Sequence, residues 1–366
     1  MLTLATSACM HGKPGQTEGY PRSDTLIPAV ATAPNGMVAT DAPIATNVGV
    51  RVLQHGGNAI DASVATAFAM AVVYPEAGNL GGGGFLVARM ADATTAALDF
   101  RETAPRAATR DMYLAESGNV TDKSLVGHLA SGVPGSVAGL WEAHKRFGSK
   151  PWSDLLQPAI DLARNGFIVD EHFSRTVARD DRLAHFPATA RLLLPGGHAP
   201  APGSRWRNPE LAIVLERIAK QGRDGFYTGE TADLIIAEMQ RGGGLITHQD
   251  LEHYQPKWRD PLTFTYRHHR IISMPPASSG GITLALMAHI LEGYDLHSLG
   301  AAAPLRYHLL AEASRRAFAD RNTFLGDPDF VTMPIALLLS EDYAARERAT
   351  ISMTHATPSA QVRPGL

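Results

Sequence analysis

The 366-residue chain contains a single cysteine, Cys9. One cysteine excludes an internal disulfide and any metal site built from several cysteines. An excess of charge of one sign is also missing, because 33 basic and 36 acidic residues leave a formal net charge of −3. Without a clustered basic face, the sequence argues against a nucleic-acid partner. No segment approaches the roughly 20 uninterrupted apolar residues of a membrane-spanning helix, so we expect no membrane span.

The composition is otherwise that of an ordinary globular protein, with 45% hydrophobic residues, 34 glycines and 24 prolines. The length suits one large domain or two modest ones. Residues 2–9 are apolar and end in small residues, as the last part of a secretory signal or a lipobox does, but the basic start of such a signal is missing. The alternative is an N-terminus with no export role. In either case we expect a poorly ordered leader over residues 1–28.

From residue 29 onward, helical and extended patterns alternate. Apolar spacing predicts helices over residues 45–55, 59–73, 139–146, 152–165, 208–221, 231–241, 282–292 and 305–322. Alternation predicts strands over residues 85–89, 94–100 and 261–272. The helix over 59–73 is small or apolar nearly all round, which indicates burial on several faces, with Asp61 placed to cap nearby amides. Residues 29–348 are therefore expected to form the domain, with a helical lobe, and 349–366 an extended, unanchored tail.

Several catalytic motifs are absent. The glycine-rich Gly78–Gly84 (GNLGGGG) does not satisfy GxGxxG and follows a helix instead of a strand, so no nucleotide cofactor site is expected. The chain has no HExxH, and we expect no metal. Ser136 and Ser278 do not lie in GxSxG. The glycines then form either a structural turn or a segment whose backbone lies close to a site.

The best candidates for functional side chains lie instead at the predicted end of the second strand, in Asp99-Phe100-Arg101-Glu102. On an extended backbone Asp99 and Arg101 point to one face and Phe100 to the other, so Phe100 can anchor the strand. An arginine at a strand end beside glycine-rich backbone can hold a substrate carboxylate through two charge-assisted hydrogen bonds. The alternative is a plain salt bridge from Arg101 to Asp99 or Glu102, which spacing alone favours.

Six segments together resemble one known family. They are Gly57–Ala62 (GNAIDA), Pro75–Phe85 (PEAGNLGGGGF), Asp99–Pro105 (DFRETAP), Gly132–Gly135 (GVPG), Met274–Gly281 (MPPASSGG) and Leu325–Pro328 (LGDP). In this order they are similar to the motifs of γ-glutamyltranspeptidases, or glutathione hydrolases, of the N-terminal nucleophile hydrolase superfamily. The resemblance covers about residues 29–365 and is to the large subunit alone. Ala277 departs from it, since the family more often has proline there.

The resemblance implies an α+β fold, a four-layer αββα sandwich completed by a separate small subunit. It implies that this chain holds no catalytic residue, because the nucleophile is the N-terminal threonine of a small subunit cut autocatalytically from the same precursor. Residues 349–366 would then lie next to the processing site. Arg101 matches the family arginine that holds the α-carboxylate of the γ-glutamyl group.

The implied substrates are glutathione and other γ-glutamyl compounds, and the implied acceptors are water and amino acids or peptides. No cofactor is implied, and the likeness favours a periplasmic or secreted protein. The residues of the chain agree with this, because an amide-cleaving enzyme needs a nucleophile and a base in reach, and we find no convincing pair in this chain.

Two alternatives stay open at this point. One is a cephalosporin (glutaryl) acylase of the same fold, which the presence of Arg101 weighs against. The other is a non-catalytic exported protein whose Arg101 binds an anionic ligand.

Overall fold

The computed structural model describes residues 31–365, so the leader expected over residues 1–28 lies outside the described residues. The chain divides into two compact units, which we call the helical unit and the hairpin unit. The helical unit comprises Gly36–Asp260. Of the described residues, the hairpin unit comprises 261–365 together with 31–35. The domain bounds 29–348 and 349–366 stay predictions.

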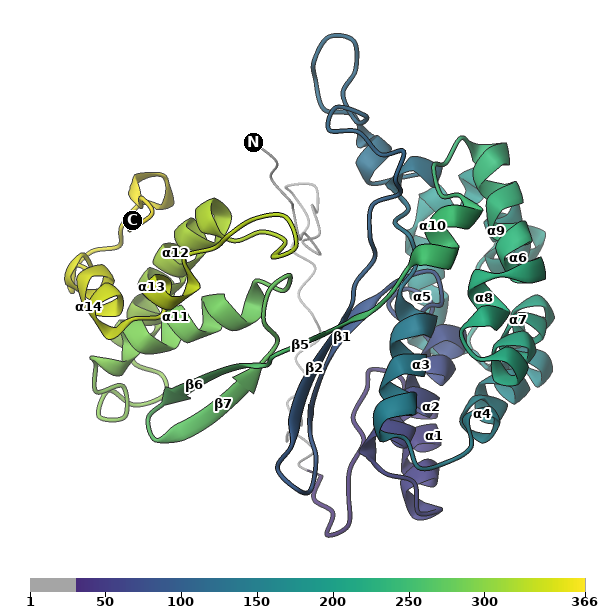
Figure 1. Ribbon diagram of the computed structural model, residues 1–366, viewed down its shortest axis with the longest axis horizontal. Helices are drawn as coiled ribbons and strands as arrows, with labels where there is room; N and C mark the ends of the chain where they lie inside the picture. The colour runs from purple at the N-terminus through teal and green to yellow at the C-terminus, as the bar shows by residue number, and fades with distance from the viewer. Residues whose placement is uncertain (1–30, 366) are drawn as a thin grey trace. The chain divides into compact units, whose positions relative to one another are not determined.

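The helical unit combines a small antiparallel sheet with a set of helices (Figure 1). The helices are α1 (Pro43–Gln54), α2 (Ala59–Val73), α3 (Ser136–Phe147), α4 (Trp152–Asn165), α5 (Glu171–Arg179), α6 (Pro187–Leu193), α7 (Pro209–Gln221), α8 (Asp224–Tyr227), α9 (Gly229–Gly242) and α10 (His248–His253). The sheet has the order β1-β2-β5, formed by β1 (Gly84–Arg89), β2 (Thr95–Phe100) and β5 (Lys257–Arg259). A short separate pair joins β3 (Phe167–Ile168) to β4 (Arg205–Trp206).

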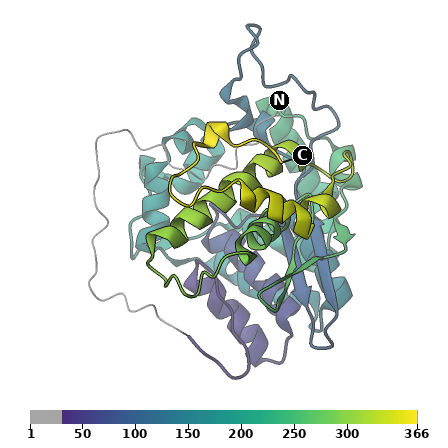
Figure 2. The same ribbon diagram turned by 90° about the vertical axis from the view of Figure 1, so that its left-hand side faces the viewer.

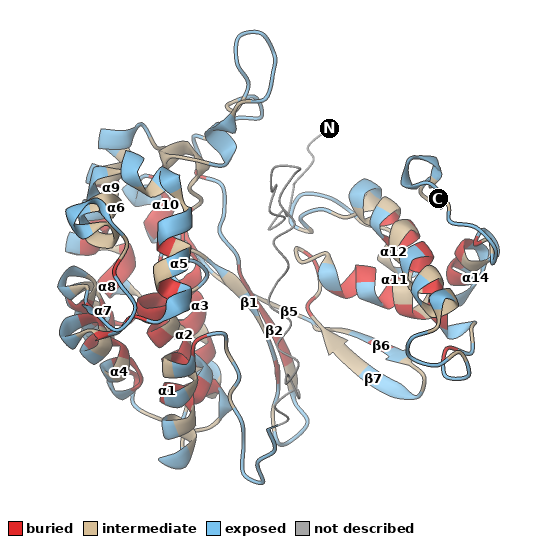
Figure 3. Cartoon of the chain, turned by 180° about the vertical axis from the view of Figure 1, so that it is seen from behind, coloured by how far each residue is buried: buried red, intermediate tan, exposed pale blue. Residues whose placement is uncertain are grey.

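Helix α2 lies in the core of the helical unit. Phe68 and Val72 are fully buried, and most of the helix is inaccessible to solvent (Figure 3), as its apolar composition predicts. Asp61 accepts hydrogen bonds from the backbone N–H groups of Asn58 and Ser149, both at 2.9 Å. Burial alone would raise the pKa of Asp61, but hydrogen bonds from the Ser149 hydroxyl and from the backbone N–H groups of Asn58, Ser149 and Lys150 outweigh it and lower the pKa. The predicted capping role of Asp61 is confirmed, and it also ties α2 to the loop after α3.

The hairpin unit packs helices on a two-stranded hairpin (Figures 1 and 2). Its elements are β6 (Leu262–Tyr266), β7 (His269–Ser273), α11 (Gly280–Glu292), α12 (Pro304–Phe324), α13 (Ile335–Leu338) and α14 (Glu341–Ala349). Helix α11 packs on β6, and both α12 and α14 pack on α11. The buried side chains Leu286, Ile290 and Leu309 form its core.

The tail after α14 is anchored to α12, and the expectation of an unanchored end is wrong. The Thr357 N–H donates to Oε1 of the buried Glu312 at 2.9 Å, and the Gly365 N–H donates to Oδ1 of the buried Asp320 at 3.0 Å. Polar backbone contacts to buried carboxylates hold the segment, so a search for apolar periodicity does not detect the anchor.

Candidate functional site

Arg101 directly follows β2, the central strand of the sheet in the helical unit. The preceding Phe100 is only 9% exposed, and its ring packs against the backbone of Gly84 and Gly139. The predicted anchoring role of Phe100 is therefore confirmed. The strand thus ends at a fixed point, and Arg101 is the first residue beyond it.

Both peptide groups that flank the Cα of Arg101 are hydrogen bonded. Its N–H donates to Asp99 Oδ1 at 3.2 Å, and its carbonyl accepts the hydroxyl of Tyr254 at 2.9 Å. The residue itself is exposed, and its guanidinium carbon lies 5.9 Å from the ring centroid of Phe85. The backbone is thus held while the guanidinium is presented to solvent.

Asp99 forms its ion pair with Arg259 of β5, at 2.9 Å between Oδ2 and Nε. Among the described residues, no ion pair joins Arg101 to Asp99 or to Glu102. The alternative of a local salt bridge, which spacing favoured, is wrong. The reason is that β5 adds a second arginine beside Asp99 from far along the chain, and the sequence around residue 99 gives no sign of it.

Three of the family-like segments meet at this end of β2. The carbonyl of Gly82 accepts the N–H groups of Gly135 and Ser136, at 2.7 and 3.0 Å. A β-bridge joins Thr103 to Val133, with the Val133 N–H donating to the Thr103 carbonyl at 2.8 Å. The segments Gly81–Gly84, Asp99–Pro105 and Gly132–Gly135 therefore form one cluster around Arg101.

Close approach explains the glycines of this cluster. A Cβ added to Gly83 would lie 2.5 Å from the Phe100 carbonyl oxygen, and one added to Gly135 would lie 1.9 Å from the same oxygen. None of Gly81–Gly84 has a positive φ. From the sequence, these glycines could form either a structural turn or a segment close to a site. The geometry shows that their backbone packs directly against the residues around Arg101.

A pocket of about 450 Å³ lies beside the same loops, between α7 and α9. Gly81 and Gly132 line one side, and aliphatic residues such as Leu211, Leu234 and Ile235 line the other. Such a lining suits an apolar group.

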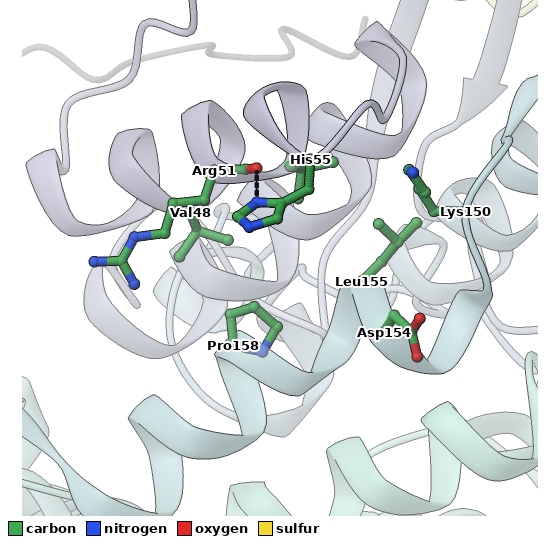
Figure 4. Close-up of a pocket in the computed structure, with 8 residues that line it drawn as sticks. Val48, Arg51, His55, Lys150, Asp154, Leu155 and Pro158 are labelled. Atoms are coloured by element: carbon green, nitrogen blue, oxygen red, sulfur yellow. Dashed lines mark hydrogen bonds between the residues drawn. The ribbon is translucent and has the colours of Figure 1, made fainter.

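A second pocket, of about 390 Å³, lies between α1 and α4 (Figure 4). Val48, Leu155 and Pro158 line it, and the His55 ring donates from Nδ1 to the Arg51 carbonyl at its edge. No residue of the cluster around Arg101 takes part in it.

Among residues 31–365, one serine–histidine contact is a candidate for a nucleophile and base. In the tail, Ser352 Oγ lies 2.9 Å from Nδ1 of the exposed His355. No carboxylate contacts His355 among residues 31–365, so the pair lacks the third group that orients a catalytic histidine. Within the same residues no group of three His, Cys, Asp or Glu side chains is placed to hold a metal ion. No helix in the described part of the chain is long and apolar enough to cross a membrane.

Two residues of this site were not predicted from the sequence. Tyr254 holds the backbone of Arg101, and Arg259 holds the carboxylate of Asp99. They lie 153 and 160 residues from their partners in the sequence. The weak strand signal before residue 261 was the available hint, since a strand that pairs with β2 brings its neighbours to Asp99. Without the pairing, neither residue stands out from other tyrosines and arginines.

Comparison with known proteins gives consistent matches. Residues 45–365 match the family model described as gamma-glutamyltranspeptidase. The chain is 47% identical over 346 residues to a protein of Pseudomonas aeruginosa named glutathione hydrolase proenzyme, a match that covers 92% of this chain and 60% of that protein. It is 41% identical to a protein named acylase ACY 1 proenzyme from Pseudomonas sp. strain V22, over 89% of this chain and 60% of that protein. The chain thus spans about 60% of the length of these relatives.

A solved structure agrees. The crystal structure of Helicobacter pylori gamma-glutamyltranspeptidase superposes with a TM-score of 0.89 at 42% identity, covering 92% of this chain and 97% of that one. The α+β architecture described above is the one found in that structure.

Proposed function

Because this chain belongs to the γ-glutamyltranspeptidase family, we propose that it is the large-subunit portion of a glutathione hydrolase, or γ-glutamyltransferase. The relatives it matches extend well beyond it, so the activity belongs to a larger assembly. The observation that supports the role of this chain is the exposed guanidinium of Arg101 on a backbone held at both flanking peptide groups.

In the proposed reaction Arg101 binds the α-carboxylate of the γ-glutamyl group through two parallel N–H···O bonds. This fixes the position of the α-carboxylate end of the substrate and so limits where the γ-carbonyl carbon, the atom to be attacked, can lie. Of the glycines beside Arg101, Gly81 is the one at which an added Cβ would meet no atom within 4 Å, so the backbone there is open to a ligand. Binding and orientation are therefore the tasks of this chain.

The nucleophile is proposed to be the N-terminal threonine of a small subunit from the same precursor. Its hydroxyl attacks the γ-carbonyl, its own α-amino group takes the proton, and the amine of the substrate leaves with a proton. An α-amino group has an ordinary pKa near 7.7–8.0, which allows it to act as a base near neutral pH. Water, or the amine of an amino acid or peptide, then takes the γ-glutamyl group from the acyl-enzyme.

The proposal extends to the architecture. We propose that the β1-β2-β5 sheet and its helices form part of a four-layer αββα sandwich, which the small subunit completes. The support is that β1 pairs with β2 alone among the described residues, so its other edge offers free backbone groups. We also propose that the assembled protein is exported and that residues 349–366 precede the processing site.

The acylase reading is the second candidate, and a relative named as an acylase, at 41% identity, favours it. Rates on γ-glutamyl-p-nitroanilide and on glutaryl-7-aminocephalosporanic acid separate the two. We expect a preference for the γ-glutamyl compound, and a preference for the glutaryl compound would overturn the proposal. A stable monomer that binds anions without turnover would instead support a binding protein.

The small subunit has its own test. We expect the full precursor to yield two polypeptides that copurify under native conditions and separate under denaturing conditions. The first residue of the second polypeptide is expected to be threonine. Cell fractionation tests the compartment.

A further inference from the structure

We propose that Tyr254 is a positioning residue for substrate binding, because its hydroxyl fixes the backbone of Arg101. This inference rests on the proposed function and adds a residue to it. Tyr254 is 4% exposed and follows α10, while Arg101 follows β2. Their link is a single hydrogen bond of 2.9 Å from the Tyr254 hydroxyl to the Arg101 carbonyl.

The hydroxyl of Tyr254 is a permanent donor. Burial raises its pKa above the ordinary value of a tyrosine, and the nearby Tyr227, Asp99 and Glu102 raise it further. The group therefore stays protonated throughout the pH range in which enzymes work. It can thus donate to the Arg101 carbonyl over that whole range.

Tyr254 is itself rigidly held. Its ring stacks on that of Tyr227, with centroids 5.8 Å apart and planes 8° from parallel. Arg223 lies with its guanidinium carbon 4.7 Å from the centroid of Tyr227, and its Nη2 donates to the carbonyls of Glu252 and Tyr254, each at 2.8 Å. The ring and the backbone of Tyr254 are thus fixed independently.

The same support reaches the neighbouring loop. The hydroxyl of Tyr227 donates to the Pro134 carbonyl at 2.7 Å and accepts the Ala138 N–H at 3.3 Å. Pro134 belongs to the Gly132–Gly135 segment of the cluster around Arg101. One stacked tyrosine pair therefore holds the arginine backbone and the loop beside it.

A second contact, from α10 itself, also holds the segment that follows β2. Asp250 accepts the backbone N–H of Arg106 through Oδ1 at 3.0 Å, and its Oδ2 accepts the Thr247 N–H at 2.9 Å. Residues 101 and 106 are thus both bound to α10 or the residue that follows it. Movement of this segment would carry the Arg101 side chain with it, so loss of the Tyr254 bond is expected to widen the range of guanidinium positions.

The test is the variant Tyr254→Phe in the assembled enzyme, assayed with γ-glutamyl-p-nitroanilide. The ring and its stack on Tyr227 remain, and only the hydroxyl is lost. Because a hydrogen bond typically contributes about 1 kcal/mol, we expect KM to rise about fivefold with kcat little changed. Tyr113→Phe is the matched control, since the Tyr113 hydroxyl also donates to a backbone carbonyl, that of Leu129 at 3.0 Å, and we expect its KM to be unchanged.

A double-mutant cycle distinguishes positioning from general structural damage. If Tyr254 acts through Arg101, then Tyr254→Phe lowers kcat/KM per active site in the wild-type background and has no further effect in the Arg101→Ala background. KM does not depend on the fraction of enzyme that is active, so partial misfolding of a variant does not obscure it.

The outcomes are distinct. An unchanged KM in Tyr254→Phe, or the same loss of kcat/KM in both backgrounds, overturns the positioning role while leaving the proposed function intact. A wild-type enzyme that does not turn over γ-glutamyl compounds overturns the proposed function itself.

Discussion

Asp99 pairs with Arg259, 160 residues away, and not with Arg101, two residues away. Asp99 is 8% exposed, and its other carboxylate oxygen accepts the Arg101 N–H. The carboxylate that local spacing assigns to Arg101 is therefore used to join β2 to β5 and to fix the Arg101 backbone. This relationship leaves the Arg101 guanidinium available to bind an anion.

The first prediction concerns that guanidinium. Arg101→Ala removes a charge-assisted contact worth about 1.5–3 kcal/mol, so KM for γ-glutamyl substrates is expected to rise by about 10- to 150-fold. Arg101→Lys keeps the charge but not the two-pronged geometry and is expected to recover part of the loss. Steady-state kinetics measure both, and the thermal midpoint should be unchanged because the side chain is exposed. Normal kinetics in Arg101→Ala would assign the residue no part in binding.

The second prediction concerns the ion pair of Asp99. Asp99→Ala removes the carboxylate from a pair whose side chains are only 16% and 9% exposed, as well as the acceptor of the Arg101 N–H. We expect the free energy of unfolding to fall by about 2–3 kcal/mol, measured by urea denaturation. Glu142→Ala is the control, because its pair with Lys145 lies on the surface of α3, and it is expected to cost less than about 1 kcal/mol. An equal fall in the free energy of unfolding in both variants would contradict a stabilising role for the Asp99–Arg259 pair.

The third prediction tests the close approach of the glycine segment. In Gly83→Ala the new Cβ would meet backbone atoms, the Phe100 carbonyl oxygen at 2.5 Å and the Glu102 nitrogen at 2.8 Å. The backbone must shift, so we expect a loss of stability of about 1–3 kcal/mol. Gly81→Ala meets no atom within 4 Å and has no positive φ, so its stability should match the wild type. Chemical unfolding of the two variants side by side makes the comparison, and equal behaviour would rule out the packing described here.

The fourth prediction is a pH dependence in the hairpin unit. Asp320 is 1% exposed, with Oδ2 accepting the Tyr343 hydroxyl at 2.7 Å and Oδ1 accepting the Gly365 N–H. Burial raises the pKa of Asp320, and burial together with the charge of Asp320 raises the pKa of Glu347. The folded state therefore holds these protons more tightly than the unfolded chain. As pH rises from the ordinary carboxylate pKa through the raised value, the unfolded chain ionises first and stability is lost.

Asp320→Asn cannot ionise, so the difference in unfolding free energy between this variant and the wild type should shift in favour of the variant as pH rises from acid to neutral. Urea denaturation across that range provides the measurement. The exposed Asp295→Asn makes the same change in the same unit without the burial. The hydrogen bond from the Ser298 N–H lowers the pKa of Asp295, so its difference should shift the opposite way, against the variant, as pH rises. A difference that does not vary with pH, or that varies equally in both variants, would show that the buried carboxyl of Asp320 does not titrate as described.

Much of the fold follows from local pattern. The helices predicted over residues 59–73 and 152–165 are observed with those bounds, because α2 is apolar nearly all round and α4 has a regular apolar stripe. The short helices α5, α10 and α14 were not predicted. Helices α10 and α14 lack a clear apolar stripe, and the capping side chains Thr247 and Ser340 define their starts. Helix α5 has an apolar face, but it is only nine residues long and buries only Phe173 and Val177.

The residues themselves determined the strand that ends just before Arg101, the anchoring of that strand by Phe100, the buried α2 helix and the order of motifs that places the chain in its family. These properties depend on neighbours in sequence and on side-chain type. Only the tertiary structure decided which carboxylate pairs with which arginine, why the glycines are needed, and that Tyr254 and Asp320 hold distant backbone groups. The glycines depend on contacts with residues 17 to 35 positions away, and the other relationships on contacts between residues at least 45 positions apart. Strand pairing and helix packing set these distances.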